Sequence, residues 1–533
     1  MLFHTWPFLV FLLIVLPVFF VLRKTRFWLP WLLVASYVFY GWWNPYYLLL
    51  VFYSTTLDYF IVLLMDHCLR EGQKVDLLGR LTRLRFNDRV LKTAYLISAL
   101  VTVVCLGLVL GGPATLRPMM GWLWLIFLLM AYGALFSSRR AWLVVSVINN
   151  LSLLLFFKYA NFVTQNMNWI LQKGHGALRL PEPATLMPFG FDYVLPVGIS
   201  FFTFQSLSYS IDFYLGKTHR ERSFLRFATF VAFFPQLLAG PIERARHLLP
   251  QFYQFPVVRM RDVTDGLSLF VVGLFKKLAL ANYLSFYVER VYERPAAADA
   301  PALMLATFAF AWQIFFDFSG YTDMARGVAR LMGFHLMLNF NNPYLATGLG
   351  DFWARWHISL STWFRDYLYI PLGGNKHGAF HTYRNLFLTF LISGIWHGAA
   401  WTFVIWGLLH ALGVMFTREL ERSAWYRESV PNLLKQIGVF IFVCFTWIFF
   451  RASSLEEALL IVRRIVGGAW TDPACPPLML GIVALIWLYQ FLYESKWRPL
   501  LQNSVVRVSL VVFMILYMCL FSSGGGAFIY FQF

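Results

Sequence analysis

Long apolar stretches separated by short polar segments run along the whole chain. A helix that spans a membrane needs about 20 mostly apolar residues. Stretches of this kind fall near residues 7–22, 28–43, 46–65, 93–111, 121–137, 141–157, 194–215, 225–240, 266–288, 302–318, 385–400, 401–417, 434–450, 478–493 and 505–521. Several are short or contain proline, glycine or charge, which is tolerated at membrane depth only under a cover of protein or water. We therefore expect roughly a dozen transmembrane helices, together with re-entrant and interfacial helices.

The composition supports this interpretation. Of 533 residues, 59% are hydrophobic and only 13% are charged, whereas soluble chains are about 45–50% apolar and about 25% charged. We expect an all-α, polytopic membrane protein surrounded by lipid.

The positive charge is distributed as in a multi-pass membrane protein. The formal net charge is +18, but the cations cluster between apolar runs, where they mark cytoplasmic segments. We therefore expect no nucleic acid as a partner. Loop 67–92 carries the densest cluster and is predicted to be cytoplasmic. Arg23, Lys24 and Arg26 follow the first apolar run rather than precede it, the opposite of a signal peptide. This run is predicted to be an uncleaved span with its N-terminus outside.

Several common chemical motifs are absent from the sequence. It contains no Walker-type glycine loop, no GxGxxG and no HExxH, which counts against an ATP-driven pump, a dinucleotide-binding enzyme and a zinc protease. Its five cysteines are scattered, so neither a disulfide framework nor a CxxC metal site is indicated. We expect no metal.

The segment from Asp351 to Gly374 has a helical pattern. Trp353, Trp356, Leu360, Trp363 and Tyr367 recur at steps of three and four and would form one apolar face. Polar residues, among them Arg355 and His357, occupy the other positions. A helix rich in tryptophan and arginine tends to lie in the membrane interface. His357 is then either one more interfacial polar residue or part of a functional site.

A second histidine interrupts an apolar run. His397 lies between Trp396 and Gly398, and an ionisable residue within a span marks a functional site by default. Histidine suits general-base chemistry because its reference pKa of about 6.5 lies near neutral pH. Gly394 and Gly398 would let a backbone or substrate come close. A core histidine bonded across helices is the alternative, and it is the favoured interpretation of His410.

Charged residues also occur between Phe315 and Asn342. Asp323 and Arg326 stand at i, i+3, a spacing that allows an ion pair. We favour a structural role for this pair, with the asparagines at 339, 341 and 342 forming a turn before Pro343. Asn44–Pro45 is likewise predicted to break the chain, as the outer turn between two spans.

Two further segments, 195–214 and 233–252, mix glycine, proline and polar residues with apolar ones. Four of their polar residues are unsuited to contact with lipid: Gln205, Asp212, Gln236 and Glu243. These side chains either line a cavity or make polar contacts between helices.

Taken together, these stretches resemble the membrane-bound O-acyltransferase superfamily, and within it the bacterial branch of alginate O-acetyltransferase membrane subunits and D-alanyl transfer proteins. The resemblance covers most of the chain, except for an additional helical pair near 77–137. The matching pieces are ASYVFYGWWNP (35–45), LPVGISFFTFQSLSYSIDFY (195–214), PQLLAGPIER (235–244), FFDFSGYTDMARGVARLMGF (315–334), NFNNPY (339–344), DFWARWHISLSTWFRDYLYIPLGG (351–374), WHG (396–398), FTWIFFRA (445–452) and FIYFQF (528–533).

The resemblance implies a single polytopic domain over residues 1–533 that transfers an acyl group. It implies that His397 is the catalytic histidine and His357 the second important polar position. We take Trp396, Asp317, Gln205 and Arg355 as candidates for the substrate channel. No bound cofactor is expected, and the acyl donor is a co-substrate, acetyl-CoA or another acyl thioester, that approaches from the cytoplasm.

The same resemblance implies a bacterial inner-membrane location, a polysaccharide acceptor and a periplasmic acetyltransferase partner, as in alginate biosynthesis. D-alanyl or another acyl transfer to a different envelope polymer is an alternative. So, from a different class, is a secondary transporter, although the inverted repeats common in transporters are not evident. Acyl transfer itself needs a base, a dry site and a donor to the developing oxyanion. His397 could be the base, and His357, Trp396 or a backbone N–H the donor.

Overall fold

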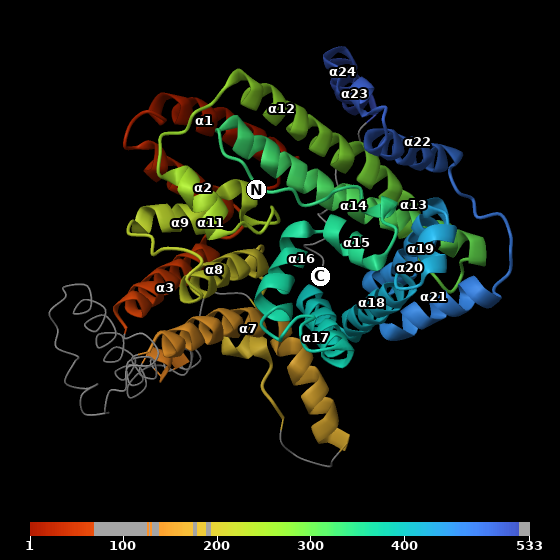
Figure 1. The fold of residues 1–533 in the computed structure, drawn as a ribbon, viewed down its shortest axis with the longest axis horizontal. Coiled ribbons are helices and arrows are strands. Elements are labelled where there is room, and N and C mark those ends of the chain that lie inside the picture. The colour runs from red at the N-terminus through yellow and green to blue at the C-terminus, as the bar shows by residue number, and fades with distance from the viewer. Residues whose placement is uncertain (69–124, 127, 131–137, 174–178, 188–192, 522–533) are drawn as a thin grey trace. The chain divides into compact units, whose positions relative to one another are not determined.

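The computed structural model describes residues 1–68, 125–126, 128–130, 138–173, 179–187 and 193–521. Its regular elements are all helices (Figure 1), which confirms the all-α prediction. Within this part of the chain, 8 helices are long and apolar enough to cross a membrane. Two shorter apolar helices, α1 (Trp6–Leu22) and α2 (Trp28–Gly41), precede them. The predicted pair near 77–137 and the cytoplasmic loop lie almost wholly outside the described residues.

The chain forms two compact units. The first contains residues 17–238 and 242–255 together with Met1, and the second contains residues 2–16, 239–241 and 256–533. Besides part of α1 and all of α2, the first unit has η1 (Pro45–Tyr47), α3 (Leu48–His67), α7 (Arg139–Lys173), η3 (Pro183–Leu186), α8 (Ile199–Tyr214), α9 (Phe224–Ala232), α10 (Phe234–Leu237), α11 (Ala245–Leu248) and η4 (Leu249–Phe252).

A buried polar network joins α3 to α7 in the first unit. The Asp58 carboxylate accepts hydrogen bonds from Ser146 Oγ at 2.7 Å and from Asn150 Nδ2 at 3.0 and 2.9 Å. All three side chains are fully buried. A buried carboxylate is tolerated only when hydrogen bonds satisfy it, so this network fixes the two helices together.

The apolar run near 225–240 is broken into α9 and α10. Phe233 between them is non-helical, with φ −53° and ψ 110°, and the backbone N–H of Phe234 donates to Ser36 Oγ at 3.1 Å instead of continuing the helix. The carbonyl oxygen of Phe230 accepts from Gln205 Nε2 and Gln236 Nε2, each at 2.6 Å. The two glutamines therefore make polar contacts between helices, one of the two interpretations left open by the sequence.

The second unit follows residue 255. Its elements are α12 (Met260–Phe275), the π-helix η5 (Lys276–Ala281), α13 (Asn282–Tyr292), α14 (Ala300–Leu331), η6 (Pro343–Leu345), α15 (Leu349–Arg355), α16 (Ile358–Phe364), the π-helix η7 (Arg365–Tyr369), α17 (Ala379–His397), α18 (Trp401–Leu420), α19 (Ala424–Ser429), α20 (Asn432–Arg451), α21 (Leu455–Gly467), α22 (Pro477–Glu494), α23 (Arg498–Gln502) and α24 (Ser504–Phe521).

Helices α12 and α14 lie side by side (Figure 1) because two pairs of glycines let their backbones touch. A Cβ added to Gly273 would lie 2.5 Å from the Gly320 carbonyl oxygen, and one added to Gly266 would lie 2.9 Å from that of Gly327. Real Cβ atoms are not found so close to backbone oxygens. Small residues at such positions permit close packing of helices in a membrane.

Turns predicted from the sequence are present. The side chain of Asn44 accepts a hydrogen bond from the backbone N–H of Tyr46 at 3.0 Å and begins η1. Asn342 has a left-handed backbone conformation, with φ 44°, immediately before Pro343. Both confirm the asparagine–proline breaks.

Candidate active site

The helix predicted from Asp351 to Gly374 is interrupted at His357. Helix α15 ends at Arg355, Trp356 is extended, and His357 is left-handed, with φ 43° and ψ 53°, before α16 begins. The prediction of one continuous amphipathic helix is therefore wrong. A left-handed conformation costs about 1–2 kcal/mol for a residue with a Cβ, so the surroundings must compensate. His357 is fully buried and does not lie on an exposed face.

The segment around Asn339 provides that compensation. The backbone N–H of Ile358 donates to the Asn339 carbonyl oxygen at 2.9 Å. The Asn339 side-chain oxygen, Oδ1, lies 3.2 Å from the Ser359 backbone nitrogen, 2.9 Å from Ser359 Oγ and 3.2 Å from His357 Nδ1. These contacts hold the strained turn and orient the imidazole.

His357 is neutral at physiological pH. Burial lowers the pKa of its imidazole from 6.5 to about 3, because removal from water disfavours the charged form. The ring packs edge to face on Phe318, with ring centres 4.7 Å apart. Aromatic carbon thus covers part of the imidazole, while Asn339 and Ser359 supply its polar neighbours.

His397 is the last residue of α17. The helix ends there because Gly398 is extended, with φ −164° and ψ 155°. Its imidazole is almost fully buried and lies 4.9 Å from the Trp406 ring and 5.4 Å from the Phe450 ring, centre to centre. The C-terminal end of a helix favours positive charge, which a general base acquires when it takes a proton.

Trp396 connects the two histidines. Its ring centre lies 6.5 Å from that of His357 and 4.9 Å from that of His397. Three of the residues named from the sequence, His357, Trp396 and His397, are therefore brought together from segments 40 positions apart in the numbering. They form a buried aromatic site with two imidazoles.

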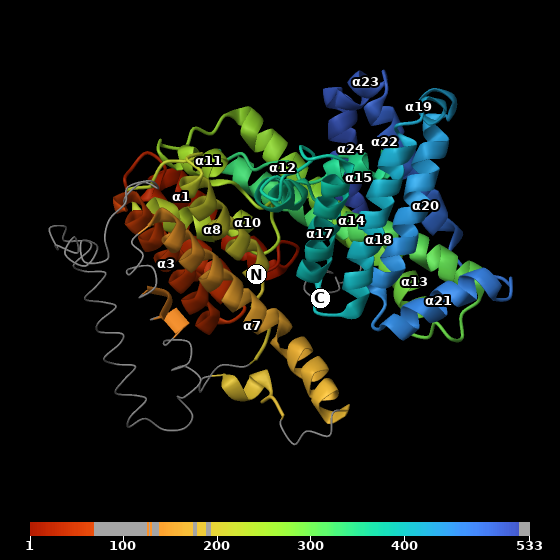
Figure 2. The ribbon, with the colours of Figure 1, turned by 60° about the horizontal axis from the view of Figure 1, so that its bottom comes forward.

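Glycines bring α17 and α18 together beside this site, as Figure 2 shows. A Cβ added to Gly407 would lie 2.5 Å from the Phe390 carbonyl oxygen and 3.1 Å from Gly394 Cα. The expectation that Gly394 admits a neighbouring backbone is confirmed. Gly398 instead faces the ring of Phe403.

Asp317 is buried in an ion pair. Its carboxylate lies 2.7 Å from Lys277 Nζ, and the two side chains are only 1% and 4% exposed. The neighbouring Asp323 contacts both Lys276, at 2.7 Å, and Arg326, at 3.4 Å, which confirms the predicted i, i+3 pair. These contacts tie α14 to η5.

The other channel candidates have well-defined partners. Arg355 pairs with Asp351 at 2.8 Å and with Glu494 at 2.7 Å, and Gln205 bonds the Phe230 carbonyl in the first unit. Their role in a substrate channel stays a prediction.

His410 has the structural role favoured by the sequence. Trp353 Nε1 donates to its Nδ1 at 3.3 Å, and Thr446 Oγ1 lies 3.0 Å from its Nε2. Both ring nitrogens are thus engaged in bonds that join α15, α18 and α20.

Comparison with known proteins identifies the family. The profile of the MBOAT, membrane-bound O-acyltransferase family, matches residues 119–459. This chain belongs to that family. A probable alginate O-acetylase of Pseudomonas aeruginosa is 36% identical over 468 residues, which cover 86% of this chain and 75% of that protein.

More distant relatives carry other names. A peptidoglycan O-acetyltransferase of Helicobacter pylori is 37% identical over 62% of this chain and 66% of its own length. A teichoic acid D-alanyltransferase of Bacillus subtilis is 29% identical over 49% of this chain and 70% of its own length. The chain is thus a multi-pass membrane O-acyltransferase, and the prediction of an enzyme rather than a transporter is confirmed.

Three buried residues with defined surroundings were not singled out from the sequence. Asn339 was assigned only to a turn, Lys277 was hidden in an apolar run, and Trp406 was one of 21 tryptophans. Trp406 is 1% exposed, and its Nε1 has no hydrogen-bond partner among the residues that the structure describes. A buried N–H without a partner is uncommon in proteins, and beside an acyltransferase histidine it is a candidate donor to an oxyanion.

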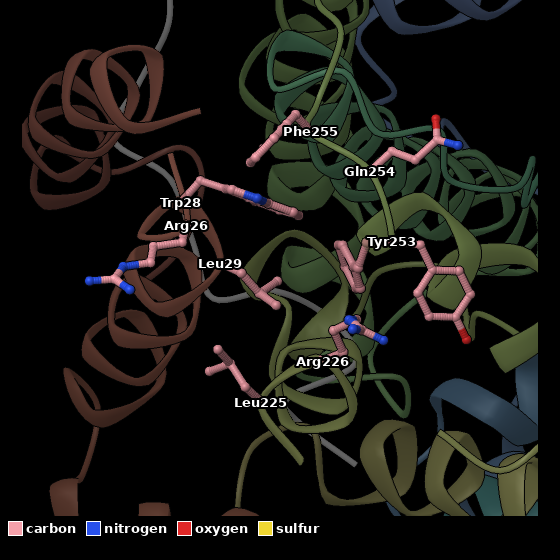
Figure 3. A pocket seen from close by; sticks show the side chains of 9 residues that line it. Arg26, Trp28, Leu29, Leu225, Arg226, Tyr253, Gln254 and Phe255 are labelled. Atoms are coloured by element: carbon pink, nitrogen blue, oxygen red, sulfur yellow. The ribbon is translucent and has the colours of Figure 1, made fainter. Parts of the chain in front are cut away.

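A pocket of about 430 Å³ lies in the first unit of the acyltransferase. Figure 3 shows Trp28 and Leu29 of α2 on one side and Leu225 and Arg226 of α9 on another, with the Arg26 guanidinium directed away. The Arg226 charge is already neutralised by Glu221 at 2.8 Å. The nine lining residues include no histidine, so this pocket does not fit acyl transfer.

The structure shows no metal centre within the described residues. No three His, Cys, Asp or Glu side chains come together there in a way that could hold an ion.

Proposed function

We propose that this acyltransferase is an O-acetyltransferase that passes an acetyl group across the bacterial inner membrane onto an exopolysaccharide. The observation that carries the proposal is the buried aromatic site in which Trp396 contacts both His357 and His397. The name of the Pseudomonas aeruginosa relative, matched over 86% of this chain, supports acetyl as the acyl group and an alginate-type polymer as the acceptor.

The donor in this proposal is an acyl thioester, for which acetyl-CoA is the first choice. His397 takes the proton of the acceptor hydroxyl while the hydroxyl oxygen forms a bond to the acetyl carbonyl carbon. The tetrahedral intermediate then collapses, the C–S bond breaks, and the departing thiolate takes the proton from the His397 imidazolium. The products are an acetyl ester and a free thiol, so atoms and charge balance.

A base positioned in a dry site is effective because no water competes for the proton or for the acetyl group. The rings of Trp396, Trp406 and Phe450 pack against His397 and exclude water from its flanks. The oxyanion of the intermediate requires an N–H donor, and Trp406 Nε1 is one indole donor beside His397.

Transfer across a membrane requires two openings, one for a cytoplasmic thioester and one for an acceptor on the other side. The acceptor is either the polysaccharide itself or a periplasmic acetyltransferase that carries the acetyl group onward. The inner membrane is the location that fits a cytoplasmic thioester donor, and its lipids surround the apolar helices.

The test supplies purified enzyme with acetyl-CoA labelled in its acetyl group and with oligosaccharides of the alginate type. Release of free thiol with transfer of label to sugar hydroxyls supports the proposal. Peptidoglycan fragments form the second acceptor arm, because the Helicobacter pylori relative is named a peptidoglycan O-acetyltransferase. A D-alanyl thioester forms the second donor arm, because the Bacillus subtilis relative is named a teichoic acid D-alanyltransferase. Exclusive use of either second arm would overturn the assignment to polysaccharide acetylation.

A further inference from the structure

Asn339 bonds His357 in a way that determines which ring nitrogen carries the proton. Neutral histidine has one N–H and one lone pair, and the hydrogen bond at one nitrogen decides the state of the other. The structure places one atom, Asn339 Oδ1, 3.2 Å from His357 Nδ1. The question is whether that atom accepts or donates.

The orientation of the Asn339 amide is fixed by Ser359. The Ser359 backbone N–H, which can only donate, lies 3.2 Å from Oδ1, and Ser359 Oγ lies 2.9 Å from it. A reversed amide would place its NH₂ donors against this N–H donor. The atom facing His357 Nδ1 is therefore the oxygen, which can only accept.

Because Oδ1 accepts, Nδ1 must donate. A hydroxyl bond from Ser359 Oγ to Nδ1 would be the alternative, but that distance is 3.5 Å, longer than the 2.9 Å to Oδ1. Both Asn339 and His357 are almost fully buried, so water does not exchange for these partners freely.

We infer that Asn339 is a positioning residue that holds His357 as the Nδ1–H tautomer, with Nε2 as the hydrogen-bond acceptor. His357 then receives protons or accepts hydrogen bonds in acyl transfer and does not donate to the oxyanion. This inference rests on the proposed acyl-transfer chemistry for its kinetic consequence but not for the tautomer itself. It also assigns the oxyanion donor to a group other than His357.

Several titratable or charged groups lie near this pair along the elements packed around it. Phe318, Phe340 and Trp396 contact the His357 ring directly and carry no charge. Along the chain, the titratable residues next to these contacts and to His357 are Asp317, which is paired with Lys277, His397 beside Trp396, Arg355, which is paired with Asp351 and Glu494, and the exposed His335 on the segment of Phe340. The charges of Asp317 and Arg355 are each balanced by an ion-pair partner. A substitution at Asn339 is therefore the most direct way to place a charge beside His357 Nδ1.

The kinetic test uses Asn339→Asp, which keeps an accepting oxygen and adds negative charge. A carboxylate beside Nδ1–H stabilises the imidazolium, so Nε2 becomes protonated over a wider pH range. Acetyl-CoA turnover by the variant should gain an acid limb, with about a tenfold lower rate for each pH unit below the raised pKa, and should recover at alkaline pH. An unchanged pH profile in a folded variant would overturn the inference.

The matched control is Asn149→Asp in the first unit. Asn149 is also buried and also accepts a hydrogen bond, from the Tyr53 hydroxyl at 2.6 Å. The same substitution there should leave the pH profile of acetyl-CoA turnover unchanged from that of the unmodified enzyme. An equal limb in both variants would mean that buried charge, and not His357, causes the effect.

A second readout is independent of activity. Nitrogen NMR of the full-length protein labelled at its 11 histidines, with His357 assigned by loss of its signals in His357→Gln, reports which nitrogen carries the proton. We expect protonated Nδ1 and bare Nε2, and a loss of this preference in Asn339→Leu. The opposite tautomer would overturn the inference even if acetyl-CoA is turned over. Failure to turn over acetyl-CoA, with the expected tautomer present, would contradict only the proposed donor.

Discussion

The imidazole of His397 meets the indole of Trp406 edge to face, with ring centres 4.9 Å apart and an interplanar angle of 81°. The two residues come from consecutive helices, α17 and α18, whose backbones touch at Gly394 and Gly407. The glycine contact thus sets the distance between the base and the indole. Any account of catalysis here has to explain why this indole N–H is buried.

Trp406→Phe tests the role of that N–H. Phenylalanine keeps an aromatic ring but removes Nε1, so the turnover number should fall about 10²–10³-fold if the indole stabilises the oxyanion. The matched control is Trp447→Phe, because Trp447 is equally buried and stacks on Trp406. Equal rate losses in the two variants would assign both effects to packing.

The stability of the protein should depend on Lys277 and Asp317 together. Asp317→Asn alone removes the carboxylate that faces a buried ammonium, a change that costs about 3–5 kcal/mol in buried ion pairs, so the melting temperature in detergent should drop sharply. Replacing both partners by apolar residues, Lys277→Met with Asp317→Leu, should restore most of the stability, because a buried pair and a well-packed apolar substitute are often close in energy. Full stability of the single variant would show that the lysine charge has another partner.

The α12–α14 contact predicts a strong position dependence among glycine substitutions. Gly273→Ala should destabilise the protein, since the new Cβ would lie 2.5 Å from the Gly320 carbonyl oxygen. Gly438→Ala is the control, because nothing lies within 4 Å of its added Cβ, and alanine is the better helix former by about 1 kcal/mol. Thermal unfolding of both variants measures the difference, and a stable Gly273→Ala protein would contradict the close packing.

The neutral state of His357 predicts a pH dependence of stability. Its pKa falls from 6.5 to about 3 on burial, so the folded state resists protonation that the unfolded chain accepts. Its contribution is complete above pH 6.5 and is lost as the pH falls towards 3, by about 2 kcal/mol at pH 5. The free energy of unfolding of the unmodified protein should therefore fall more between pH 8 and pH 5 than that of the His357→Gln variant. Parallel curves would indicate that the pKa of His357 is the same in the folded and unfolded states.

Much of the architecture followed from the sequence because hydrophobic runs and local motifs carry it. The membrane class, the asparagine–proline turns, the Asp323–Arg326 pair and the structural role of His410 depend on composition or on residues close in sequence. Such features are encoded locally and can be read without the fold.

The features that the sequence did not predict have a common physical cause. The helical pattern of 351–374 continues through His357, but hydrogen bonds donated to Asn339, 18 positions earlier, hold a left-handed turn that breaks the helix there. Likewise Lys277 lies 40 positions from its partner Asp317, and the glycines of α12 and α14 are meaningful only once the helices pack. Periodicity cannot show contacts between distant segments, and these contacts build the site.

The most direct test of the account is the rate of thioester turnover in His397→Ala. The measurement uses purified full-length protein and acetyl-CoA, with melting temperature and size-exclusion profile as checks of folding. His381→Ala is the control, because His381 lies exposed on the same helix. We predict a loss of about 10²–10⁴-fold in His397→Ala and none in His381→Ala. A folded His397→Ala protein that turns over acetyl-CoA at the normal rate would contradict the assignment of His397 as the base.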